Sequence, residues 1–278
     1  MRGHDAPTVV TTRRGFVIAA GAAAAAAVAV GIEAFVWEPR RLTVTRHRLG
    51  GGAAPLRIVQ VSDLHLQAIN AFETEVASTI TQLEPDVIVI TGDSIDKGNR
   101  VGVLVDFLAQ LDAETPKYAV LGNWDYWSGA PRRELRSVYE RHHCRLLVNE
   151  TVTHEHRGGV VRMTGVDDLL GGAPNVSSAD GGDPGEPHLL LAHCPAFRER
   201  AERAAPGRFT CMLAGHTHGG QIRFFGFAPV LPRGSGGYVS GWYRSEGRMP
   251  LYVSRGIGTS LLRARLGAPP EISVFEVG

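Results

Sequence analysis

The stretch Cys211–Ile222 reads CMLAGHTHGGQI, and the rest of the chain is arranged around it. Its short apolar run meets Gly215, and His216 and His218 follow on either side of one threonine. In an extended segment, side chains two positions apart point the same way, so both imidazoles would face one site. Neutral imidazole binds zinc, iron and manganese. A lone pair of histidines beside a turn is more often simply exposed, so other parts of the sequence must support a metal site.

Four more short apolar runs end on residue types that bind metals. They lead to Asp63 and His65 after Leu56–Val61, to Asp93 after Val87–Ile90, to Asn123 after Lys117–Leu121, and to His193 after Leu189–Leu191. Each has an ordinary alternative: Asp63 could cap a helix, Asp93 could shape a turn, and His193 could be a buried core histidine. Ligands of open α/β sheets gather at the carboxyl ends of strands. Coincidence at five strand ends is much less plausible than one shared site.

Segments with helical periodicity alternate with these runs, which indicates an α/β domain. We expect helices at Ala71–Leu83, Val101–Leu111, Pro131–Cys144 and from Pro195 to about Ala204. We expect further strands at Leu42–Thr45 on a sheet edge, Arg145–Glu150, Thr151–His156, Val160–Val166, Phe209–Leu213, Leu251–Ser254 and Ile272–Glu276. The segment Gly171–Pro187 is rich in Gly, Pro, Ser and Asp, which is typical of a loop.

Composition excludes several classes of protein. The chain has 278 residues, a net charge of +1 and 44% hydrophobic residues, as ordinary globular domains do. The balanced charge gives no support to binding of a nucleic-acid polymer. Three scattered cysteines form no disulfide framework, and without CxxC a structural thiolate zinc site is not expected. We expect a monomer.

The N-terminus has the features of an export signal. Arg13 and Arg14 precede Phe16 and an Ala-rich apolar segment that reaches about Ile32, as in twin-arginine signals. An uncleaved anchor is the alternative, because the apolar stretch is about 20 residues long and could span a bilayer. We expect residues 1–38 to be this signal or anchor and residues 39–278 to be the catalytic domain, in the cell envelope.

The predicted ligand set is too large for one ion. Two carboxylates, one amide and four histidines suit two sites that share a bridging aspartate, with the ions about 3.5–4 Å apart. Mixed N and O ligands without thiolate favour manganese, iron or zinc. Such a pair lowers the pKa of a shared water and neutralises phosphoryl oxygens, so the expected nucleophile is a bridging hydroxide and the expected reaction is phosphate-ester hydrolysis.

The order of these motifs resembles the calcineurin-like metallophosphoesterase superfamily. The resemblance implies a four-layer fold, with two mixed β-sheets sandwiched between helices. It also implies one ion held by Asp63, His65, Asp93 and His218 and another held by Asp93, Asn123, His193 and His216. The N-terminal arginine pair and the C-terminal segment resemble the exported YkuE/YaeI-like phosphodiesterase branch. Related members of that branch are linked to pyrophosphate cleavage in UDP-2,3-diacylglucosamine, so the resemblance implies a phosphodiesterase or pyrophosphohydrolase, with lipid-linked substrates and membrane association.

One position departs from the family pattern. The block Gly-Asn-His-Asp/Glu is here Gly122-Asn123-Trp124-Asp125, so the imidazole usually credited with protonating the leaving group is absent. Indole cannot act as a general acid near neutral pH. Another donor, a leaving group that needs no proton, or slow turnover would each account for this. A pyrophosphate leaving group needs no proton, which favours diphosphates or activated diesters; the general acid stays unassigned.

Further residues are candidates for substrate contacts. Asn123, Gly219 and Gln221 are expected to approach the phosphate, because glycines after the HxH allow the backbone close access. The late arginines Arg255, Arg263 and Arg265 are candidates for holding anionic groups, or are surface charges. The aromatic and glycine-rich run Phe224–Tyr243 is expected to line a substrate mouth or to touch lipid.

Two other functions are compatible with these motifs. A phosphomonoesterase differs only in what crowds the metal site. A non-catalytic metal-binding scaffold of the same fold is disfavoured, because all seven expected ligands are present.

Overall fold

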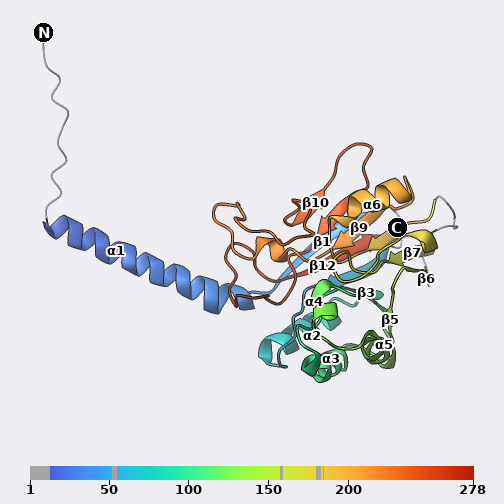
Figure 1. Cartoon of the computed structure of the whole chain (residues 1–278), viewed down its shortest axis with the longest axis horizontal. Helices are drawn as coiled ribbons and strands as arrows, with labels where there is room; N and C mark the ends of the chain where they lie inside the picture. The colour runs from blue at the N-terminus through green and yellow to red at the C-terminus, as the bar shows by residue number, and fades with distance from the viewer. Residues whose placement is uncertain (1–12, 52–54, 157–158, 180–182, 184) are drawn as a thin grey trace, which may run out of the picture.

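The computed structural model describes residues 13–51, 55–156, 159–179, 183 and 185–278. It shows two six-stranded mixed sheets packed face to face, with helices on both outer faces (Figure 1). The expected α/β class and four-layer arrangement are therefore confirmed. Residues 1–12 and the side chains of Arg13 and Arg14 lie outside the described part, and with them most of the predicted twin-arginine motif.

The first sheet has the strand order β1-β12-β2-β3-β4-β5. Its strands are β1 Thr43–Leu49, β12 Glu271–Val277, β2 Leu56–Val61, β3 Val87–Thr91, β4 Lys117–Val120 and β5 Cys144–Leu146. Strands β2 to β5 run parallel, and β12 pairs antiparallel with β2. The predicted edge strand is β1, which pairs parallel with β12.

The second sheet has the strand order β10-β11-β9-β8-β7-β6. Its strands are β10 Gly241–Tyr243, β11 Leu251–Val253, β9 Cys211–Ala214, β8 His188–Leu191, β7 Gly159–Gly165 and β6 Glu150–His156. Strands β11, β9, β8 and β7 are parallel, whereas β10 and β6 pair antiparallel at the two edges. The sequence pattern had not indicated β10, which is only three residues long.

The helices cover the outer faces of the sheets. They are α2 Ala71–Gln82, α3 Val101–Leu108, α5 Arg132–Arg141 and α6 Phe197–Ala204. The short helix α4 Asn123–Trp127 lies instead just after the carboxyl end of β4. The predicted helices at Val101–Leu111 and Pro131–Cys144 both end earlier, and Cys144 begins β5 instead. Helix α4 was not predicted, because its five residues are too few to show a helical period.

Alternation along the strands divides the apolar side chains among three cores. In β3, Ile88 and Ile90 pack under α2, α3 and α5, whereas Val87 and Val89 point between the sheets. In β8, Leu190 points instead toward α6. A strand covered on both faces therefore reads as a continuous apolar run, which explains why these strands were predictable. The same packing places the carboxyl ends of β2, β3 and β4 in one sheet near those of β8 and β9 in the other.

A long N-terminal helix extends away from this domain (Figure 1). Helix α1 spans Arg13–Ile32 and is followed by a short π-helix, η1 Glu33–Trp37, and a short 3-10 helix, η2 Glu38–Arg40. The stretch Gly15–Arg40 is long and apolar enough to cross a membrane, by length and composition. This single apolar helix fits a signal or an anchor.

Candidate metal centre

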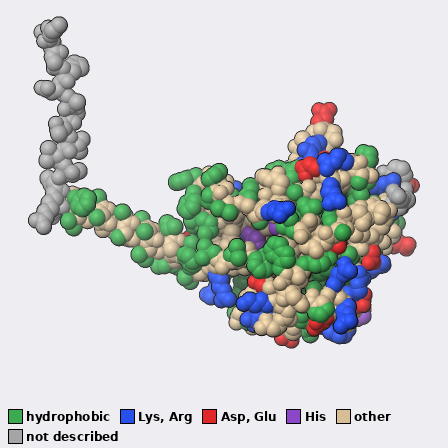
Figure 2. Space-filling model, in the orientation of Figure 1, with side chains coloured by type: hydrophobic (Ala, Val, Ile, Leu, Met, Phe, Trp, Pro, Cys, Tyr) green, Lys and Arg blue, Asp and Glu red, His purple; other side chains and the backbone are tan. Residues whose placement is uncertain are grey.

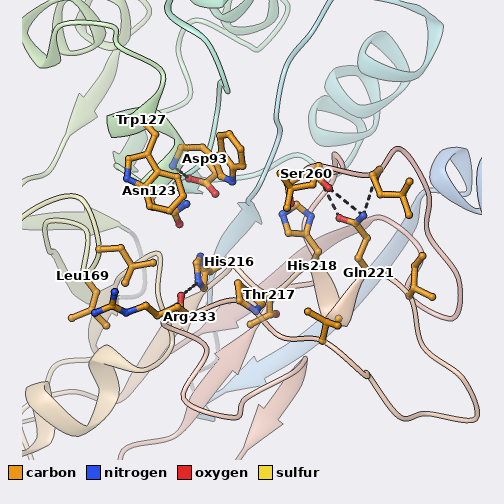
Figure 3. A pocket seen from close by; sticks show the side chains of 18 of the residues that line it. Asp93, Asn123, Trp127, Leu169, His216, Thr217, His218, Gln221, Arg233 and Ser260 are labelled. Atoms are coloured by element: carbon orange, nitrogen blue, oxygen red, sulfur yellow. Dashed lines mark hydrogen bonds between the residues drawn. The ribbon is translucent and has the colours of Figure 1, made fainter.

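All seven predicted ligands lie at the carboxyl ends of strands and point into one region between the sheets. Asp63 and His65 follow β2, Asp93 follows β3, Asn123 begins α4 directly after β4, His193 follows β8, and His216 and His218 follow β9. Each of these side chains is buried. Figure 3 shows four of them, Asp93, Asn123, His216 and His218, around a common cavity.

The first group of ligand atoms comes from Asp63, His65 and His218. One potential ligand atom from each residue lies within 4.8 Å of the other two. The Nε2 atoms of His65 and His218 are 3.1 Å apart, and Nε2 of His218 is 3.5 Å from Oδ1 of Asp63. One carboxylate and two imidazoles thus converge on a space suited to a divalent cation.

The second group consists of Asp93, His193 and His216, within the same 4.8 Å limit. Nε2 of His193 lies 3.1 Å from Oδ2 of Asp93 and 3.1 Å from Nδ1 of His216. Asn123 adds an amide oxygen 3.2 Å from Nε2 of His193. Oδ2 of Asp93 is also 3.7 Å from Nε2 of His65, so this carboxylate lies between the two groups.

Outer hydrogen bonds orient three of the imidazoles. Nδ1 of His193 is 2.8 Å from the carbonyl oxygen of Thr91, and Nε2 of His216 is 2.7 Å from that of Arg233. Nδ1 of His65 contacts the carboxylate of Asp96. A carbonyl or carboxylate accepts the proton at one nitrogen, so the other nitrogen keeps its lone pair for the centre.

The electrostatics of the centre favour positive charge. Burial alone would raise the pKa of Asp93, but His193, His65 and His216 outweigh it and hold this pKa below its usual value. Burial lowers the pKa of His193, yet Asp93 and Asp63 raise it to about 10. Two buried carboxylates therefore stabilise a positive charge between them, as a cation site requires. The oxygen and imidazole donors fit two divalent ions.

The HxH segment is not extended, so the expectation that both imidazoles point the same way was wrong. His216 and His218 have φ angles of 75° and 52°, in the left-handed region. The backbone N–H of His216 donates to both carboxylate oxygens of Asp63, at 2.9 and 3.0 Å. This turn sends His216 to the second group and His218 to the first, so the segment supplies both.

Two glycines allow the strand ends to approach one another. A Cβ at Gly215 would lie 1.9 Å from Oγ of Ser62 and 2.5 Å from a carboxylate oxygen of Asp63. A Cβ at Gly122 would lie 2.2 Å from Oδ1 of Asp93. Only glycine leaves room for these contacts, which explains why glycine precedes each of these ligand-bearing turns.

A cavity of about 720 Å³ opens beside the two groups. Its inner end is formed by ligand side chains, but most of its wall is apolar. The apolar residues lining it are Trp124, Trp127, Leu169, Leu170, Ile222, Pro229, Val230, Pro232, Leu261 and Leu262. Trp124 sits edge-on to His65, with ring centroids 6.1 Å apart. The site can therefore take a polar reacting group at its inner end and an apolar group at its mouth.

The structure gives two of the late arginines internal roles. The guanidinium of Arg265 is fully buried and donates to the carbonyls of Gly258, Ala268 and Arg255. Arg255 is paired with Glu271 at 3.2 Å. Neither is a free surface charge, and their role in holding anionic groups stays a prediction. Arg263 is exposed.

Gln221 lines the cavity, but its side chain also holds the surrounding loops together. Its amide donates to the carbonyls of Ser260 and Leu262 and accepts from the N–H of Ser260. Gly219 has a φ of 62°, and a Cβ there would meet the side chain of Arg255. The predicted substrate contacts of Asn123, Gly219 and Gln221 stay predictions.

Three residues near the centre were missed in the sequence. Asp96 contacts His65, and Asp125 accepts the backbone N–H groups of Gly122, Asp93, Ser94 and Ile95. Arg233 lines the cavity. Asp96 and Asp125 each follow an expected ligand by two or three positions, a spacing that any loop acid could have. Arg233 lies in the long loop between β9 and β10 and follows no strand directly, so its position in the sequence did not mark it.

Comparison with known proteins is consistent with this geometry. The model of the family "Calcineurin-like phosphoesterase" matches residues 56–220. The chain is 30% identical to "Phosphodiesterase YaeI" of Escherichia coli, an alignment covering 96% of this chain and 99% of that protein. It is also 30% identical to the metallophosphoesterase YkuE of Bacillus subtilis, covering 86% and 87%. A bovine "Transmembrane protein with metallophosphoesterase domain" is 30% identical, covering 82% of this chain and 54% of the bovine protein.

Proposed function

Because the chain belongs to the calcineurin-like phosphoesterase family and is a hydrolase of phosphoric esters, we propose that it is a dinuclear phosphodiesterase or pyrophosphohydrolase of the cell envelope. The substrate we propose is a lipid- or nucleotide-linked diphosphate, of which UDP-2,3-diacylglucosamine is an example. The observation that carries this proposal is the cavity, in which two buried ligand groups meet a largely apolar wall. The similarity to a protein named a phosphodiesterase supports the diester class.

We assign seven residues to two divalent ions, which we propose to be manganese, zinc or iron. Asp63, His65, Asp93 and His218 would hold one ion, and Asp93, Asn123, His193 and His216 would hold the other. When bound, such ions activate water and neutralise charge on the phosphoryl oxygens. The protein residues keep these donors oriented, since the outer hydrogen bonds of His65, His193 and His216 fix their rings.

The wall of the cavity supports the choice of substrate. Trp124 occupies a position where it can pack against an apolar group but cannot protonate a leaving oxygen. A leaving group of low pKa, such as a nucleotide phosphate, departs without a proton. Arg233 is the arginine among the residues that line this cavity. Its guanidinium is suited to binding the second phosphate of a diphosphate.

The N-terminal segment supports a location at the membrane. We propose that α1 is an export signal of the twin-arginine type or a retained anchor, and that the catalytic domain follows it. The helix is apolar and exposed along its length, as a membrane-spanning segment is. The boundary proposed at residue 38 lies inside η2, and the side chain of Glu38 is buried against the domain, so Glu38 itself belongs with the domain.

Hydrolysis of two chromogenic esters by the full chain in detergent tests this function. The esters are bis(p-nitrophenyl) phosphate and p-nitrophenyl phosphate, with added manganese or zinc. We expect diester turnover that disappears in Asp93→Asn and persists in Asp106→Asn. Asp106 is an exposed acid in α3 that belongs to neither ligand group. Preference for the monoester would support a phosphomonoesterase instead. Metal binding without hydrolysis of either ester would support the non-catalytic scaffold.

A further inference from the structure

We propose that a cluster of exposed apolar residues beside the cavity mouth inserts into the lipid bilayer next to α1. We call it the apolar platform; its members are Phe224, Phe225, Phe227, Val230, Leu261 and Leu262. This surface is separate from the metal centre, and it rests only on the membrane location of α1 proposed above.

The platform is exposed to a degree that is unusual for such large side chains. Phe225 is fully exposed, and Leu261 is 93% exposed. Contiguous apolar surface of this kind marks a binding surface rather than ordinary exposure of single residues. These side chains therefore need an apolar partner in the functional state of the protein.

The charges around the platform suit a membrane interface. The nine residues Phe224–Pro232 carry no charge, and arginines stand on either side, at Arg223 and Arg233. Arg263 directly follows the two leucines. Aromatic and aliphatic side chains flanked by arginine are typical of segments that bury their apolar part at the boundary between headgroups and acyl chains. The exposed Arg263 can then reach a lipid phosphate.

The backbone holds the platform outward in a defined shape. Phe224 and Phe227 exchange two backbone hydrogen bonds of 2.9 Å and close a tight turn, with Phe225 and Gly226 at its tip. Phe225 has a φ of 50° and Leu261 a φ of 58°, both in the left-handed region. Bulky residues rarely occupy this region, and where they do the strain commonly serves a function. The two most exposed apolar side chains are thus presented by strained turns.

The platform and the anchor are fastened to the same segment. The N–H of Arg265 donates to the carbonyl of Ala34 at 2.9 Å, and Glu38 accepts the N–H groups of Gly267 and Ala268. On its other side this segment binds the turn that carries the phenylalanines, since the N–H of Arg223 donates to Leu266 at 2.7 Å. The end of α1 and the platform therefore occupy fixed positions relative to each other.

The figures show where this places the platform. In Figure 1 the orange loops that follow β9 lie beside the end of α1 that joins the domain. In Figure 2 hydrophobic side chains gather on this part of the surface, close to the apolar surface of the helix. A bilayer crossed by α1 would thus meet the domain at the platform. Because Val230, Leu261 and Leu262 also line the cavity, its mouth would open toward the lipid.

Site-specific fluorescence in single-copy nanodiscs tests the platform. The native cysteines Cys144, Cys194 and Cys211 are buried, so an introduced cysteine can be labelled selectively. The full chain carrying Phe225→Cys or Leu261→Cys would be labelled with an environment-sensitive fluorophore and placed in bilayers with and without lipids that carry a quencher at shallow acyl depth. Ala204→Cys is the control, since it is exposed on α6, on the side of the domain away from α1 (Figure 1).

We expect the label at positions 225 and 261 to shift its emission to shorter wavelength and to lose most of it to the quencher lipid. The label at 204 should show neither change. Labels at 225 and 261 that behave like the label at 204 would overturn the proposal. Shielding that appears only when several copies share a nanodisc would show that a second chain covers the platform, and would overturn it too. Flotation of the same labelled proteins with vesicles reports separately whether α1 is inserted.

A second readout connects the platform to substrate access. The triple variant Phe224→Ser, Phe225→Ser, Phe227→Ser leaves every residue that lines the cavity in place. We expect it to hydrolyse soluble bis(p-nitrophenyl) phosphate at the wild-type rate, while a phosphodiester embedded in the same bilayer is cleaved at least several-fold more slowly. Equal loss on both substrates would indicate a folding defect, and no loss on either would contradict a role in access.

Discussion

At the scale of single residues, the centre is built from strained turns that hydrogen bonds hold in place. Asp63, His65 and Asp93 have φ angles of 52°, 45° and 54°, as unusual for these residues as those of the HxH pair. Their N–H groups and carbonyls interlock, since Asp63 donates to Gly92 and His65 donates to Asp93. Backbone conformations of this kind cost about 1–3 kcal/mol each and persist where a site requires them.

Asp96 is expected to position His65 rather than to bind substrate. Replacing it in Asp96→Asn removes the charge that faces Nδ1 of His65, and we expect metal affinity or hydrolysis to fall about 10- to 100-fold. Metal titration by calorimetry, together with diester hydrolysis at saturating metal, measures both effects. Gln67 shares the carboxylate and keeps the loop in place. An unchanged metal affinity in Asp96→Asn would show that Asp96 has no positioning role.

Trp124 is expected to restrict the enzyme to good leaving groups. Restoring an acid in Trp124→His should raise hydrolysis of a dialkyl phosphodiester by roughly 10²-fold, at the low end of what general acids contribute, and leave bis(p-nitrophenyl) phosphate unaffected. The backbone N–H of residue 124 still donates to Asp93 in the variant. Trp127→His is the matched control, because that ring lines the same cavity. Equal rate changes for both esters would refute this account.

At the scale of elements, the carboxyl ends of the parallel strands carry the candidate ligands, whereas other positions of the strands hold the sheet together. Strands β7 and β8 illustrate this, because the side chains of Thr164 and His188 on these adjacent strands hydrogen bond at 2.7 Å. The ring of His188 packs edge-on against Phe209, with centroids 4.8 Å apart. This histidine lies at the start of β8, at the opposite end from His193. The same residue type therefore serves packing at one end of a strand and the candidate metal centre at the other.

His188 gives stability a pH dependence of known sign. Burial, and then the charges of Arg162 and Arg208, lower the pKa of His188 to about 4. Between about pH 6.5 and pH 4 the unfolded chain binds this proton and the folded chain does not, so stability falls as the pH falls, by at most about 3 kcal/mol from this residue. We expect His188→Gln to reduce this loss of folding stability with falling pH, measured by chemical denaturation at a series of pH values. A change equal to that in the control variant His143→Gln, an exposed site, would contradict it.

At the scale of the whole molecule, the N-terminal segment and the domain form one unit. Glu38 connects the two, and we call it the joint. Its carboxylate is buried and accepts two backbone N–H groups from the segment that also carries Leu261 and Leu262. A flexible tether would need no such contacts. The position of α1 relative to the domain is therefore determined by the fold.

Removing the Glu38 carboxylate should lower the stability of the domain without changing the proposed membrane binding of α1. In Glu38→Ala the N–H groups of Gly267 and of the buried Ala268 lose their acceptor, and we expect about 2 kcal/mol of destabilisation and a lower Tm in detergent. Flotation with vesicles should persist, because α1 is unchanged. Glu33→Ala removes only a partly exposed pair with Arg41 and should cost less than about 1 kcal/mol. Equal Tm values for the two variants would argue against the joint.

Some features of this protein follow from the sequence by itself. Buried parallel strands read as continuous apolar runs, and a polar residue ends each one at the sheet edge, so the α/β class and the convergence of Asp63, Asp93 and His193 were predictable. Local pattern alone carries that information, since strand ends are set by residues next to one another in the chain.

Other features were decided only by tertiary structure. The turn after β9 takes left-handed angles because Asp63, 153 residues away, accepts the N–H of His216, and no local pattern encodes this. The apolar cavity wall and the burial of Arg265 likewise depend on loops that meet only when both sheets have packed. Contacts between residues distant in sequence are made by the assembled fold, and they determine which donors join each group of candidate ligands and which side chains face solvent.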